Sequence, residues 1–208
     1  MCIIILDMFR EQFVGRNPSH FVSSTVVRAF ITSELFLWSA WDTVIPFLSL
    51  FLIKNIPGAN LQTAAFGYSI YLITRVIFEL ISGKDLAHSS DKKKIYAAIF
   101  GLILTSIACF GFAFINVLPL VFISYIFAGI GIGVASPAKN SLFSTHLDPK
   151  KAPAEWSIYD AVVFICIALA TSLGGFIATV YGFEVFFVIA ALWVLIGTVP
   201  YLLYIRNR

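Results

Sequence analysis

Long apolar runs separated by short polar stretches dominate this chain. An α-helix needs roughly 20 apolar residues to cross the hydrocarbon core of a bilayer, which is about 30 Å thick. Tight connections, such as KNIPGAN at 54–60 and YGFE at 181–184, separate runs of this length. The pattern predicts an all-α membrane protein with six transmembrane helices, at about 28–53, 62–83, 95–115, 119–143, 156–180 and 184–205.

The composition supports a membrane protein and argues against other classes. The 208 residues are 60% hydrophobic and 12% charged, with a mean hydropathy of +0.93, which excludes an ordinary soluble domain. The three cysteines and three histidines lack metal-ligand spacing, and no phosphate-binding loop or nucleophile motif occurs. We therefore expect a non-enzyme in the lipid bilayer, with no catalytic residue, cofactor, metal or nucleic-acid partner.

Lysine and arginine fall almost entirely on one side of the predicted spans. Basic clusters precede the first span, follow the second, end the fourth and close the chain, whereas Lys54 alone lies on the other side. The positive-inside rule therefore predicts that both termini are cytoplasmic. We expect an integral protein of a prokaryotic cell membrane, with a transmembrane domain at 28–205 and a cytoplasmic tail at 206–208.

Residues 1–27 are expected to form a cytoplasmic or interfacial N-terminal segment. Ile3, Leu6, Phe9 and Phe13 recur there at helical spacing, with charged residues between them. This pattern favours a short helix that lies on the membrane surface. Packing of the same apolar face against the main body is the alternative.

Ionisable residues inside the spans are the most informative feature of the chain. On insertion scales each costs about 2.5–3.5 kcal/mol at the bilayer centre, so such residues are rarely kept without a use. The third and sixth spans have none in their interiors. We therefore expect the other four helices to surround a polar interior, and the third and sixth to face lipid or pack at the edge. The residues are Glu34 and Asp42 in the first span, Arg75 and Glu79 in the second, Lys139 at the end of the fourth, and Glu155 and Asp160 at the start of the fifth.

Helical phase gathers the ionisable and aromatic residues of the first and second spans into one face on each helix, and we expect the two faces to look at each other. Asp42 lies near the midplane without an evident partner, so it is the best candidate to carry a proton. Arg75 and Glu79 are spaced as an i,i+4 pair, and the alternative is that this pair merely neutralises two charges for insertion. The proton-coupling candidates are Asp42, Glu34 and Glu79, and the solute-binding candidates are Arg75, Trp38, Trp41, Tyr68 and Tyr71.

Three further stretches complete the pattern. The fourth span has Gly129 and Gly133 four residues apart, then Pro137, which favours close helix packing followed by a bend. The stretch GKDLAHSSDKKK at 83–94 links the second and third spans, and LDPKKAPAEWSIYDAVVF at 147–164 leads into the fifth. Together these features resemble one half of a major facilitator superfamily transporter, closest to a C-terminal half, over about residues 25–205.

The resemblance implies an architecture and a set of gate residues. Family members hold their substrate between two six-helix halves, with the first, second, fourth and fifth helices of each half near the cavity. The missing half implies a parallel homodimer, or a complementary half encoded separately or in the same longer chain. Alternating access would be controlled at the cytoplasmic end, where the gate candidates are Gly83, Asp85, Asp91, Lys92 and Asp160.

The first hypothesis for function is therefore secondary active transport of a small solute, proton coupled, by a homodimer of half-transporters. A nontransporting membrane scaffold that keeps this fold is the alternative from another class. A membrane enzyme or lipid flippase is a third possibility, for which the sequence shows no catalytic constellation.

Overall fold

The computed structural model describes residues 25–147 and 152–206, and the regular structure of these residues is entirely α-helical. Six stretches are long and apolar enough to cross a membrane, which confirms the predicted fold class for the described residues. The predicted surface helix within residues 1–24 lies outside them. The helices are α2 (Thr25–Asn55), α3 (Leu61–Leu86), α4 (Asp91–Phe114), α5 (Leu118–His146), α6 (Ala152–Val180), α7 (Gly182–Ile196) and α8 (Val199–Arg206).

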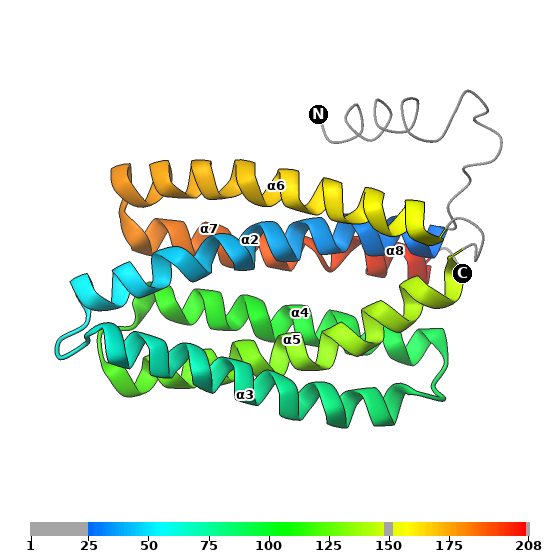
Figure 1. Ribbon diagram of the computed structural model, residues 1–208, viewed down its shortest axis with the longest axis horizontal. Coiled ribbons are helices and arrows are strands. Elements are labelled where there is room, and N and C mark those ends of the chain that lie inside the picture. Colours follow the sequence, from blue (N-terminus) through cyan, green and yellow to red (C-terminus); the bar gives the residue numbers. More distant parts are fainter. Residues whose placement is uncertain (1–24, 148–151, 207–208) are drawn as a thin grey trace.

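The helices form one bundle in which consecutive spans run in opposite directions (Figure 1). On one side α2 packs against α6 and α7, and on the other α5 packs against α3 and α4, while contacts between α4 and α7 join the two sides. The start of α2 and the end of α8 lie at the same end of the bundle, as six spans require. That this end is cytoplasmic stays a prediction from the basic residues.

Capping side chains allow helices α3 and α4 to begin before their apolar runs. At the start of α3, Asn60 accepts a hydrogen bond from the Thr63 amide at 3.0 Å, and the Thr63 hydroxyl accepts one from the Asn60 amide at 2.8 Å. At the start of α4, Ser90 accepts from the Lys93 amide at 3.4 Å. These bonds satisfy amides that have no partner within the helix, so α4 begins four residues before its first apolar side chain.

The sixth span is broken near its middle. Helix α7 ends at Ile196, and the amide of Gly197 bonds back to the Val194 carbonyl at 3.0 Å. Pro200 lies in the first turn of α8 and has no amide hydrogen to donate to the Ile196 carbonyl. The proline therefore explains why one apolar run gives two helices.

Glycines bring α5 into backbone contact with α3. A Cβ atom at Gly129 would lie 2.8 Å from the Tyr71 carbonyl oxygen, and one at Gly133 would lie 2.6 Å from the Arg75 carbonyl oxygen. Neither position has space for a side chain. The close packing predicted for the fourth span is confirmed, and it positions α3, which carries Arg75, against the bundle.

We expect Gly133→Ala to lower the free energy of unfolding by roughly 1–3 kcal/mol, because the new methyl group must push two backbones apart. The matched control is Gly83→Ala at the end of α3, where the new Cβ would lie 3.8 Å from Pro137, an ordinary contact. Denaturant titration of both variants in mixed micelles measures the difference. Equal stability of the two variants would contradict the close contact of α3 with α5.

Among the spans that the structure describes, α3 and α6 are the least buried. Their apolar windows are 17% and 22% buried, against 44% for both α4 and the span formed by α7 and α8. The position of the third and sixth spans at the edge stays a prediction, because these values describe burial inside a single six-helix unit. Helices α4 and α7 have no interior charge and pack against each other, although α4 still exposes one apolar stripe: Tyr96, Phe100, Ile103, Ile107, Phe110 and Phe114.

Candidate functional site

A buried ion pair joins α2 to α5. Lys139 donates a hydrogen bond to one carboxylate oxygen of Glu34, and the two side chains are 1% and 3% exposed. The second oxygen of Glu34 accepts from Trp38 Nε1 at 2.7 Å and from the Tyr159 hydroxyl of α6 at 3.2 Å. The carboxylate thus has three donors from three helices, which offset the desolvation of its charge.

A second polar group joins α2 to α3. Arg75 Nε lies 3.4 Å from Glu79 Oε2, and an Arg75 terminal nitrogen donates to the Tyr71 hydroxyl at 3.4 Å. The same hydroxyl accepts from Trp41 Nε1 at 3.2 Å. The two predicted faces therefore do meet, and Arg75 and Glu79 do form the i,i+4 pair.

The indole ring of Trp38 connects the two groups. Lys139 Nζ and the guanidinium carbon of Arg75 each lie 5.8 Å from the centre of this ring. Both distances are within the range of cation–π attraction. The polar side chains of α2, α3, α5 and α6 consequently form one continuous cluster, which we call the four-helix polar cluster: Glu34, Trp38, Trp41, Tyr71, Arg75, Glu79, Lys139 and Tyr159.

Asp42 lies beside this cluster near the middle of α2. The side chain is half-buried, and within the described residues it has no hydrogen bond or ion pair. Arg75 is the charged group that acts on its carboxylate electrostatically. Asp42 is thus the carboxylate of this region with capacity left for a proton or a ligand.

The aromatic solute-binding candidates differ in accessibility. Trp41 and Tyr71 are buried, with 0% and 1% of their surfaces exposed, whereas Tyr68 is 37% exposed and stacks on Tyr71 with a centroid distance of 5.6 Å. Trp38 is partly buried. In this conformation Tyr68 and Arg75 reach the surface, and Trp41 and Tyr71 support them from behind.

The gate candidates lie at the end of the bundle where α3 ends and α4 begins (Figure 1). Asp85 forms an exposed ion pair with Lys93 at 2.9 Å, and Asp91 lies 3.4 Å from His146 Nε2. Lys92 lies 6.0 Å from the ring centre of Tyr96. At this end Gly83 packs beside Pro137, and Asp160 is exposed on α6.

Lys139 and Tyr159 are the cluster members that sequence reasoning did not place in the site. Lys139 was recognised as a charge at the end of the fourth span, but not as the partner of Glu34. Both residues lie within a few turns of the end at which α2 begins, as Glu34 does. A comparison of the depths of opposite charges in different spans could have paired Lys139 with Glu34.

A sequence model of the Major Facilitator Superfamily matches residues 30–208. The chain belongs to this superfamily. Among solved structures it resembles the POT family transporter PepTSo, with a TM-score of 0.74 and 15% identity over 86% of this chain and 37% of that one. It also resembles a peptide transporter POT in complex with sulfate, with a TM-score of 0.72 and 18% identity over 90% of this chain and 38% of that one. At these identities the likeness shows the fold alone.

Sequence relatives include the Proton-coupled antiporter flippase LtaA of Staphylococcus haemolyticus, 28% identical over 102 residues, which are 49% of this chain and 26% of the relative. The protein of that name from Staphylococcus epidermidis is 26% identical over 101 residues, 48% of this chain and 25% of the relative. The matches thus span about a quarter of each relative's length. They support the superfamily assignment, which rests on the sequence model that matches residues 30–208.

Proposed function

We propose that this chain supplies one half of a secondary active transporter, which moves a small solute across the cell membrane with proton coupling. The observation that carries the proposal is the position of Asp42 and Arg75. Both lie near mid-span, and Arg75 and Glu79 are still 27% and 38% exposed on the outer helix α3. Charged groups at this depth are unfavourable against hydrocarbon, so the face that carries them is expected to border a water-filled cavity.

A second six-helix unit would enclose that cavity. The solved family members resembled here are longer, since this chain covers 37% and 38% of them. We propose that a second copy in the same orientation supplies the other unit and brings two Asp42 and two Arg75 side chains to one cavity. A separately encoded half, or the remainder of a longer chain, is the alternative.

Within the cavity we assign separate roles to the carboxylates and the aromatic residues. Asp42 has no ion-pair partner in the described part of the chain and takes the proton, with Glu79 and the buried Glu34 as further proton-coupling candidates. Arg75 and Tyr68 contact the solute, and Trp38, Trp41 and Tyr71 hold them in position. The LtaA relatives are named as proton-coupled antiporters, which supports the proton as the coupling ion.

The gate is proposed at the end of the bundle that is predicted to be cytoplasmic. Rocking of one unit against the other would make and break contacts of the charges there: the exposed Asp85, Lys92 and Asp160 and the half-buried Asp91. Gly83 has room for a Cβ atom beside Pro137, so the end of α3 is packed less tightly against α5 than at Gly129 and Gly133.

A second candidate function is translocation of an amphiphilic lipid rather than a water-soluble solute. The flippase named among the relatives favours it. The difference is testable, because a flippase equilibrates a labelled lipid between leaflets, while a solute transporter changes the contents of the vesicle lumen.

The test is reconstitution of the full chain into proteoliposomes with a pH-sensitive dye inside and an imposed proton gradient. After the oligomeric state is measured by light scattering, pools of amino acids, peptides, sugars and organic anions are added in turn. We expect the chain to be a dimer, and we expect one pool to accelerate dissipation of the proton gradient. A stable dimer that moves neither protons with any pool nor labelled lipid would support the scaffold alternative and overturn the proposal.

A further inference from the structure

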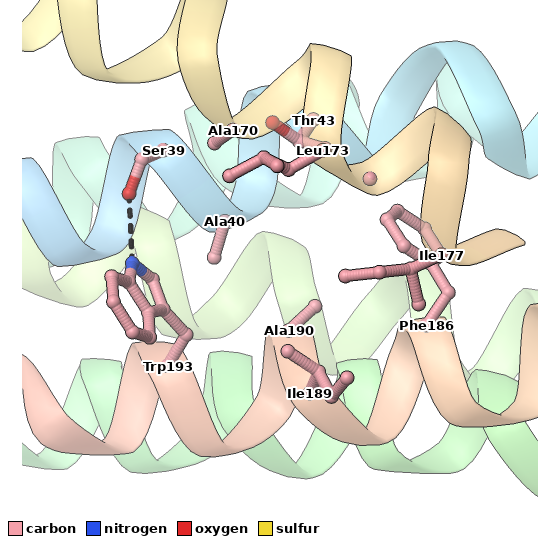
Figure 2. Close-up of a pocket in the computed structure, with 11 residues that line it drawn as sticks. Ser39, Ala40, Thr43, Ala170, Leu173, Ile177, Phe186, Ile189, Ala190 and Trp193 are labelled. Carbon is pink, nitrogen blue, oxygen red and sulfur yellow. Dashed lines mark hydrogen bonds between the residues drawn. The ribbon is translucent and has the colours of Figure 1, made fainter.

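A narrow groove opens between α2, α6 and α7, with a volume of about 230 Å³ (Figure 2). At about 100° per residue, the side of α2 that lines it is roughly opposite Trp38, so the groove is separate from the four-helix polar cluster. Small side chains, Ala40 and Ala190, form its floor, and Leu173 and Ile189 form its walls.

The polar side chains of this groove are already hydrogen-bonded. Trp193 Nε1 donates to the Ser39 hydroxyl at 3.0 Å, and Ser39 in turn donates to the Leu35 carbonyl. Thr43 is hydrogen-bonded to Thr171 at 3.1 Å. The described lining residues include no ionisable side chain. Water and polar ligands therefore find no free partner there, and an apolar cavity of this kind stays dry and binds hydrocarbon.

The groove lies at the depth of lipid acyl chains. Its lining on α7 runs from Phe186 to Trp193, four to eleven residues after Gly182. At 1.5 Å per residue this is about 6 to 16 Å below the membrane end of α7, in the half of the bilayer next to the α6–α7 connection. Residues 39–43 of α2, at the middle of its span, run along the groove, with Ser39 beside Trp193 at its deep end.

The mouth of the groove is continuous with the outer apolar surface of α6 and α7. Leu173, Ile189 and Trp193 are 63%, 41% and 42% exposed, and Leu169, Phe176 and Leu192 extend the same surface. In a chain with six stretches that can cross a membrane, such a surface is suited to contact with lipid tails. Lipid can thus enter sideways without crossing a polar rim.

We propose that this groove binds one acyl chain of a bilayer lipid from the leaflet on the side of the α6–α7 connection. The chain lies along α7 between Phe186 and Trp193, and the Ser39–Trp193 and Thr43–Thr171 hydrogen bonds keep its walls apolar. The site does not depend on the proposed transport function, because it lies on another face of α2.

The test uses the full chain in vesicles of phosphatidylethanolamine and phosphatidylglycerol that contain a trace of phosphatidylglycerol with a diazirine at mid-chain. After illumination, mass spectrometry of peptides measures labelling of the 169–177 and 186–193 segments. Ala170→Leu places a larger side chain in the groove, and we expect it to reduce this labelling several-fold. The matched control Ala168→Leu adds the same atoms on an exposed position of α6 outside the groove and should leave labelling unchanged.

A widening variant keeps the test decisive if Ala170→Leu fails to fold. Leu173→Ala opens the mouth and should increase labelling of the α7 segment. Labelling equal to that of the exposed stripe of α4, and insensitive to both Ala170→Leu and Leu173→Ala, would reduce the groove to ordinary lipid contact and overturn the proposal. Labelling of monomers with none in dimers would mean that a second copy covers the groove, which also overturns it.

Discussion

Replacement of Lys139 by methionine is expected to lower the free energy of unfolding by about 3–5 kcal/mol, because it leaves the buried Glu34 carboxylate without its cation. Glu34→Gln should destabilise by a similar amount, since Lys139 then lacks its anion. Neither side chain can reach water, as both are almost fully buried in the pair. Titration with sodium dodecyl sulfate in mixed micelles measures the loss.

The double variant Glu34→Gln with Lys139→Met removes both charges and should recover most of the stability. Two matched neutral side chains need no desolvation of an ion, so replacing a buried pair is often close to neutral. The exposed pair of Asp85 and Lys93 is the control, with exposures of 65% and 54%, and Lys93→Met should cost less than about 1 kcal/mol. A double variant as unstable as the single ones would show that the pair is not the cause.

The fold could be predicted because each span is a separate apolar run of sufficient length. Residues 54–60 and 181–184 mark turns that no helix crosses, and the structure places them between α2 and α3 and between α6 and α7. Helical phase also put Trp41, Tyr71 and Arg75 on faces that meet, and the hydrogen bonds to the Tyr71 hydroxyl bear this out. These features depend only on the sequence of residues within a single helix.

Features that depend on which helix packs against which could not be predicted in the same way. Phase places Glu34 on a face of α2 but does not say that Lys139 lies opposite, since that depends on the packing of α5. The packing of α4 against α7 could not be predicted for a related reason. Their sequences are apolar on all sides, so the pattern does not distinguish a lipid-facing surface from one that packs against protein. The apolar groove between α2, α6 and α7 could not be predicted either. Ser39 and Thr43 are polar in sequence, and only the structure shows that their hydroxyls are already hydrogen-bonded.

Asp42→Asn is expected to reduce proton-driven transport by about a hundredfold or more, the contribution typical of a positioned acid or base. The substitution keeps the shape of the side chain and removes its ability to bind and release a proton. Because Asp42 has no hydrogen bond or ion pair in the described part of the chain, folding and assembly should be unaffected. Proton flux in proteoliposomes, reported by the dye, measures the effect. The control is Glu184→Gln, which changes an exposed carboxylate at the start of α7.

The same variant tests how many copies share the cavity. If two copies form one transporter and both Asp42 residues are needed, flux from mixed wild-type and variant chains should fall more steeply than the fraction of wild-type chain. A transporter in which this chain meets a different second half has one Asp42 per cavity, and its flux should fall in proportion. Undiminished coupled flux in pure Asp42→Asn would remove the proton role. A variant that loses its dimer rather than its transport would make Asp42 a residue of assembly, as the scaffold alternative requires.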